Sequence, residues 1–203
     1  MTDPATHVFW ITSRSAGITA LVCASASVAA GLALGGSVGA LAGLVRGRTA
    51  HLRTLHEALS LAALAALLVH GLALLGDAYL RPGLLDITVP FISHYRPFWT
   101  GLGIVGAYGL AALSLTYYAR ARIGVARWRT LHRFIAFFWL LGVVHTLGAG
   151  TDAGRGWFLL LLAVVVLPPL SLLAIRVTAP VRSGRAAQGQ AAGTLARREA
   201  RRA

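Results

Sequence analysis

Residues 55–76 read LHEALSLAALAALLVHGLALLG and decide the fold, because the run is apolar over almost its whole length. An α-helix needs about 20 such residues to cross the hydrocarbon core of a bilayer. The run holds one acidic residue, Glu57, near its start, and two histidines, His56 and His70, which lie 14 positions apart. Ionisable side chains at membrane depth are costly and mark functional candidates. The stretch therefore predicts a transmembrane helix that carries part of a site.

Four further runs have a similar length and apolar character. Together they give five predicted spans, at residues 17–43, 55–76, 99–119, 130–150 and 157–177. The composition agrees, since 57% of the residues are hydrophobic and 12% are charged, against about 45–50% and about 25% in soluble domains. This composition excludes disordered proteins, fibrous proteins and most soluble enzymes. We expect an all-α integral membrane bundle of about five helices over residues 1–178.

The arginines predict how the bundle is oriented. All 19 basic residues are arginine, and four of them, Arg14, Arg81, Arg96 and Arg155, fall on one side of the predicted spans. The others fall on the opposite side, in the loops after spans one and three and in the tail. The positive-inside rule then predicts an amino terminus outside and a carboxyl terminus in the cytoplasm. An odd number of spans requires the same arrangement.

The net charge of +13 does not predict nucleic-acid binding once the arginines are placed. Residues 179–203 are rich in Gly, Ala, Gln and Arg, a composition too small and polar to fold alone. We expect a basic, disordered cytoplasmic tail whose arginines meet anionic lipid of the bilayer.

Four of the seven histidines form a pattern. His56 and His70 lie on the second predicted span, and His132 and His145 lie 13 positions apart on the fourth. Both spans cross in the same direction, so His56 and His132 share an inner level and His70 and His145 an outer level, about 20 Å away. Paired imidazoles without carboxylate or thiolate suit the axial ligation of two stacked b-type haems. A single cysteine, Cys23, excludes the covalent attachment of c-type haem.

The two histidine spacings are not equivalent on an ideal helix. A step of 14 residues returns to nearly the same face, about 40° short, whereas a step of 13 falls about 140° short. The fourth span must twist, kink, or present its two histidines around different sides of the haems. The sequence leaves these alternatives open.

Other residues are candidates for supporting roles. Phe138 and Trp139 lie halfway between His132 and His145, where a ring could fill the space between haems, although ordinary core or lipid-facing positions explain them equally well. The candidate propionate contacts are Arg53, Arg129 and Arg133 for the inner haem, and Arg14, Arg81 and Arg96 for the outer one. Positive-inside topology explains the inner three equally well.

The remaining histidines have no assigned ligand role. We expect His51 at the inner interface, His7 in a mobile terminus and His94 in an outer loop, where it could line an acceptor or metal site. Residues 101–106 spell G-x-G-x-x-G, but they follow no strand and lie inside an apolar span. The sequence therefore predicts no flavin or nicotinamide site in this chain.

With His-x13-His on one span and His-x12-His two spans later, the chain resembles the ferric-reductase-like transmembrane domain family. That family includes NADPH oxidases, iron reductases and the membrane subunit of the bacterial methionine sulfoxide reductase system. Shorter stretches, at residues 55–57, 95–97 and 148–152, are similar to small bacterial members, and the resemblance covers roughly residues 8–178. It implies a multi-pass protein of the bacterial plasma membrane that holds two haem b.

The resemblance implies electron transfer from the cytoplasm to the outside, as the membrane subunit of a reductase system. NADPH oxidases and iron reductases append flavin and nicotinamide domains and often have six spans, whereas this chain has a short tail and five. The donor would therefore be a separate flavoprotein or a quinol on the cytoplasmic side, with the outer acceptor left open. The alternatives are a haem-free transporter that uses its histidines for protons or metal, and a membrane scaffold.

Overall fold

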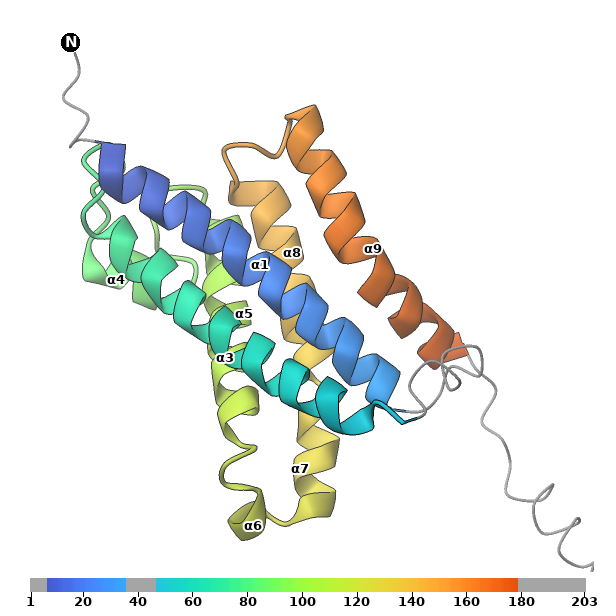
Figure 1. Cartoon of the computed structure of the whole chain (residues 1–203). Helices are drawn as coiled ribbons and strands as arrows, with labels where there is room; N and C mark the ends of the chain where they lie inside the picture. Colours follow the sequence, from blue (N-terminus) through green and yellow to red (C-terminus); the bar gives the residue numbers. More distant parts are fainter. Residues whose placement is uncertain (1–6, 36–46, 179–203) are drawn as a thin grey trace, which may run out of the picture.

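The computed structural model describes residues 7–35 and 47–178. Within these ranges the chain is helical and has no strand (Figure 1). The helices are α1 (Val8–Leu34), α3 (Thr49–Leu74), α4 (Leu84–Thr88), α5 (Pro97–Leu115), α6 (Arg120–Ile123), α7 (Val125–His132), α8 (Ile135–Ala149) and α9 (Gly156–Thr178). Five spans, with α7 and α8 counted as one, are long and apolar enough to cross a membrane. The predicted fold class is confirmed, and the chain is a multi-pass membrane protein.

The first span begins earlier than the sequence predicted, at Val8 rather than Gly17. The polar residues before Gly17 made the apolar run look shorter, but Ser13 and Arg14 find partners on other parts of the bundle, as described below. The helix can therefore continue through them. The predicted end of this span, Gly43, and the predicted tail at 179–203 lie outside the described residues.

The other spans overlap the predicted ones, although the second begins at Thr49, six positions before the predicted start at residue 55. The third ends its regular helix at Leu115 and continues in tighter turns, with Tyr117 N–H donating to the Ser114 carbonyl over 3.2 Å. The fourth begins at Val125, five positions before the predicted 130, because α7 carries arginines that lowered the local hydropathy.

The long helices form two antiparallel pairs. α1 packs along α3, α5 packs along α8, and α9 lies against α1 (Figure 1). The core between them is made of buried apolar side chains, namely Leu21, Val28, Trp139, Val143 and Val166. Large apolar side chains also face outward, for example Leu68 and Val164, which are 62% and 66% exposed. Such surfaces are expected where a helix meets lipid.

The fourth span is broken between its two histidines. α7 ends at His132 and α8 begins at Ile135. Across the junction the Phe134 N–H donates to the Leu131 carbonyl and the Phe137 N–H to the Phe134 carbonyl, both over 3.0 Å. These i→i+3 bonds are the 3₁₀ pattern, which rotates by about 20° more per residue than an α-helix. Of the alternatives that the 13-residue spacing left open, the structure contains a local overtwist and break.

Candidate functional site

Two of the predicted histidines meet where the helix pairs face each other. His56, in the first third of α3, and His132, the last residue of α7, have ring centroids 6.0 Å apart and ring planes at 83°. Two imidazoles that bind one metal ion from opposite sides, with nitrogens at about 2.0–2.1 Å, have centroids about 6.4 Å apart. The separation of these residues, which we call the 56/132 pair, is close to that value.

The other two histidines form a second pair at a separate level. His70 lies in the last turns of α3, and His145 lies near the end of α8. Both lie at the opposite ends of their spans from the 56/132 pair. We call them the 70/145 pair. Among the described residues, no group of three or more His, Cys, Asp or Glu side chains is arranged to hold a metal ion.

Three of the four imidazoles donate Nδ1–H to a backbone carbonyl of a neighbouring helix. The bonds run from His56 to Ser27 (2.9 Å), from His70 to Ser13 (2.8 Å) and from His145 to Trp99 (2.9 Å). A carbonyl oxygen can only accept, so Nδ1 must carry the proton and Nε2 is unprotonated in the neutral ring. A hydrogen bond of this kind is the usual support of a metal-bound histidine, because it fixes the ring and raises its basicity.

His132 differs from the other three. Its Nδ1 is buried and has no hydrogen-bond partner among the described residues. Its ring packs instead on Trp128, one turn earlier in α7, with centroids 5.1 Å apart and planes at 37°. The Trp128 Nε1 is likewise buried without a partner in the described part of the chain. His132 is therefore oriented by ring packing, whereas the other three are oriented by hydrogen bonds.

Close helix approach also shapes the 70/145 pair. Gly103 of α5 faces the His145 ring so closely that a Cβ there would lie 2.5 Å from Nδ1. Trp99, which accepts the His145 bond, is one turn away on the same helix. The His145 imidazole is thus confined between a glycine and a carbonyl of α5.

The six candidate propionate arginines occupy different environments. Arg53, Arg129 and Arg133 are exposed at the end of the bundle nearer the 56/132 pair. Arg14 forms an ion pair with Asp152 and lies over the rings of Trp10 and Trp157, with 4.9 and 5.9 Å to the centroids. The guanidinium of Arg14 therefore already has an anionic partner that joins α1 to the loop before α9.

The remaining two arginines hold the loop between α3 and α5. Arg81 Nε donates to the Ala78 carbonyl over 2.9 Å, and Arg96 donates to the Gly148 carbonyl over 2.5 Å. Arg96 has a positive φ of 42° directly before α5. Its bond attaches the start of α5 to the end of α8, near His145.

The two candidate aromatics face different helices. Trp139 is 1% exposed and donates from Nε1 to the Ser25 hydroxyl over 2.9 Å, which places it in the core against α1. Phe138 faces α5, where its ring lies against Gly109. Trp139 lies between His132 and His145 along the chain, and Ser25 lies between Ser13 and Ser27, so this contact is at a level between the two histidine pairs.

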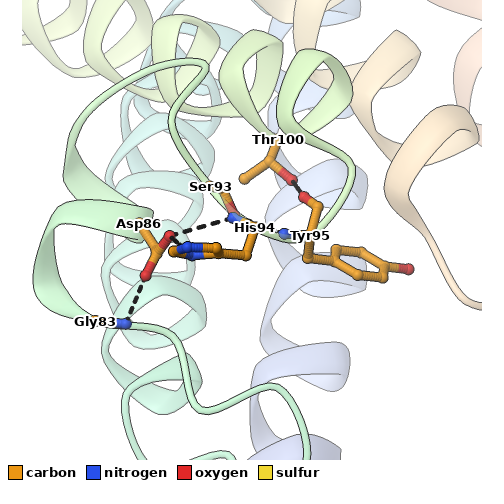
Figure 2. A network of polar contacts seen from close by, with 6 residues as sticks. All are labelled: Gly83, Asp86, Ser93, His94, Tyr95 and Thr100. Carbon is orange, nitrogen blue, oxygen red and sulfur yellow. Dashed lines mark hydrogen bonds and ion pairs between the residues drawn. The ribbon is translucent and has the colours of Figure 1, made fainter.

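His94 lies in the loop before α5, beside Asp86 (Figure 2). Its side chain is 95% exposed, and its Nδ1 lies 3.0 Å from the carboxylate of Asp86. That carboxylate also accepts the N–H of Gly83 over 2.8 Å, the main cause of the lowered pKa of Asp86, and the His94 contacts lower this pKa further. His7 and His51 are exposed. None of these three joins a histidine pair.

Sequence reasoning missed the groups that orient the imidazoles. Ser13, Ser27 and Trp99 act through backbone carbonyls, which every residue has, so their residue types gave no direct signal. Gly103 was noted only as part of a G-x-G-x-x-G pattern, whereas the structure places it against His145. The exception is the spacing of the two serines, which could have been compared with the spacing of the histidines.

Comparison with known protein families gives a match. A family described as the ferric reductase like transmembrane component matches residues 16–143, which is more than half of the 203-residue chain. The match covers α3, α5, α7 and most of α1 and α8, and includes three of the four paired histidines. Neither a curated protein nor a solved structure shows significant similarity.

Proposed function

The chain belongs to the ferric reductase-like transmembrane family, and from this premise we propose that it carries electrons across the membrane through two b-type haems. His56 and His132 would hold one haem, and His70 and His145 would hold the other. The observation that carries the proposal is the 6.0 Å separation of the 56/132 rings, which is close to the spacing that one shared metal ion requires.

Three of the four imidazoles, those of His56, His70 and His145, have hydrogen bonds that favour the protonation state that ligation needs. The carbonyls of Ser27, Ser13 and Trp99 hold the proton on Nδ1 and leave the Nε2 lone pair of each ring available. Two histidines would hold each haem, and a haem held in this way would supply electron transfer rather than the binding of oxygen or substrate.

Bound haem supplies an iron that alternates between the ferric and ferrous states. The protein would hold each haem, orient its ligands and shield it from solvent. The four histidines would hold the haems at two levels, and the carbonyls fix the orientations of three of the rings. The apolar helices would keep water and ions away. Trp139 lies between the two levels and fills the core there.

The arginine distribution supports an orientation with the 56/132 pair near the cytoplasm and the 70/145 pair near the outside. Electrons would then enter from a separate flavoprotein or a quinol on the cytoplasmic side and leave to an acceptor outside. The exposed Arg53, Arg129 and Arg133 are placed to meet haem propionates or a donor at the entry end. We propose that the protein works in a bacterial plasma membrane as the membrane subunit of a reductase system.

Haem content tests the proposal. Protein purified in detergent from haem-supplemented cells should show the spectrum of low-spin b-type haem, and pyridine haemochrome titration should give two haems per chain. The exposed His51→Ala variant is the matched control and should keep both. Haem-free protein from such cells would contradict the proposal and favour the transporter or scaffold alternatives, and one haem per chain would mean that one histidine pair has another role.

A further inference from the structure

α1 carries no ligand, yet its sequence repeats at the spacing of the α3 histidines. Ser13 and Gly17 form one Ser-x-x-x-Gly unit, and Ser27 and Gly31 form a second unit 14 positions later. His56 and His70 on α3 are also 14 positions apart. Since 14 residues are nearly four helical turns, each set lies along one face of its helix.

The antiparallel packing of α1 and α3 brings the two repeats into register. Ser27 contacts His56, and Ser13 contacts His70. We propose that Ser13, Gly17, Ser27 and Gly31 position the His56 and His70 imidazoles for haem binding. We call these four residues of α1 the cradle. This inference rests on the proposed haem function and assigns positioning residues to a helix that holds no ligand.

Each serine makes a two-way contact with its histidine. The Ser13 carbonyl accepts the His70 Nδ1–H, and the Ser13 hydroxyl donates back to the His70 carbonyl over 3.1 Å. The Ser27 carbonyl accepts the His56 Nδ1–H. The Ser27 hydroxyl lies 3.3 Å from the His56 carbonyl and 2.7 Å from the Ser60 hydroxyl, which donates to the same carbonyl over 2.8 Å. Both serines are buried, at 3% and 5% exposure. The contact therefore fixes the backbone and the ring of each histidine together.

Each glycine lets a ring lie directly on the α1 backbone. A Cβ at Gly17 would lie 3.0 Å from Nδ1 of His70, and a Cβ at Gly31 would lie 3.1 Å from Cε1 of His56. These separations are shorter than ordinary van der Waals contacts, so an added Cβ would require the ring to move by a few tenths of an ångström, and a larger side chain would require more. The serine defines the hydrogen bond, and the glycine one turn later defines how close the ring comes.

The cradle predicts effects that are specific to one level. Gly17→Leu should displace His70 and remove the haem of the 70/145 pair, so that haem content falls from two per chain to one. Gly31→Leu should do the same to the haem of the 56/132 pair. The control is Gly71→Ala, next to His70 on α3, where an added Cβ meets nothing within 4 Å and both haems should remain. The haem that stays in each leucine variant reports that the bundle has folded.

Milder variants separate positioning from folding. Ser13→Ala and Ser27→Ala keep the carbonyl but remove the hydroxyl, and should each weaken the retention of one haem about tenfold, as is typical when outer-shell groups are lost. Each should also shift the EPR signal and midpoint potential of that haem alone. A change in general helix packing would not select one haem.

The outcomes distinguish the cradle from the proposed function. Wild-type protein without haem would overturn the proposed function itself. Wild-type protein with two haems, together with variants at positions 13, 17, 27 and 31 that change neither haem, or both haems equally, would overturn the cradle alone. If a leucine variant loses both haems, the corresponding serine variant decides, because an EPR shift in one haem supports the cradle and an unchanged spectrum rejects it.

Discussion

The 70/145 pair and the 56/132 pair use the same residue type but orient it differently. Both rings of the 70/145 pair donate Nδ1–H to a carbonyl, one on α1 and one on α5. In the 56/132 pair His56 does so, whereas His132 rests on Trp128 and its Nδ1 has no partner in the described part of the chain. The difference follows from position, because His132 ends α7 at a helix break while the other three lie inside continuous helices. The imidazoles of the 70/145 pair are therefore oriented by more hydrogen bonds than those of the 56/132 pair.

Replacing the histidines themselves has the largest expected effect on this comparison. If the pairs are as the structure places them, His56→Ala and His132→Ala each lose the same haem, and His70→Ala and His145→Ala each lose the other. Redox titration of the four variants should show one missing step in each. If His56→Ala and His132→Ala remove different steps, the assignment of these two histidines to one haem is wrong.

Crowding His145 tests the 70/145 pair from the α5 side. A Cβ at Gly103 would lie 2.5 Å from the His145 ring, which the Trp99 carbonyl prevents from moving freely. We expect Gly103→Ala to weaken the binding of the haem at the 70/145 pair by about 10–100-fold. Gly142→Ala on α8 is the control, since its added Cβ meets nothing within 4 Å. Equal loss of both haems would show that Gly103 serves helix packing in general.

The unequal hydrogen bonding predicts unequal midpoint potentials. A carbonyl that accepts Nδ1–H makes the imidazole more basic and favours the ferric iron. The 70/145 haem, with two such ligands, should therefore have the lower potential, and the 56/132 haem the higher. Potentiometric titration of wild-type protein, with steps assigned from the histidine variants, measures the order. The reverse order would mean that nearby charges outweigh the hydrogen bonds.

The smallest effect is expected from the exposed Asp86–His94 contact. Because the pKa of Asp86 is lowered in the folded protein, its contribution to stability is present above its ordinary value of 3.8 and is lost as the pH falls through the lowered value. At neutral pH, Asp86→Asn should loosen the loop before α5 and shift the 70/145 haem signal slightly. The signal of the 56/132 haem should stay unchanged in the same EPR spectrum. A change in that signal would show that the loop also affects the 56/132 pair.

Much of this architecture could be predicted from local properties of the chain. Apolar runs gave the five spans, because hydropathy and length alone decide whether a helix suits a bilayer. The levels of His56, His70, His132 and His145 followed from the fixed rise of a helix. The start of α1 was predicted too late, because its polar residues are stabilised by partners on distant segments, such as Asp152 for Arg14.

The sequence by itself determined the membrane bundle and the two histidine levels, since both depend on residue type and on distance along one helix. The tertiary structure alone decided which groups orient the imidazoles. The carbonyls of Ser13, Ser27 and Trp99 reach their histidines through the rotation and spacing of neighbouring helices, and a carbonyl has no residue-specific signal. It also decided how a 13-residue spacing is accommodated. The tight turns at Phe134 lie between α8, which packs along α5 and contacts α1, and α7, whose main contacts are with α5 and α6.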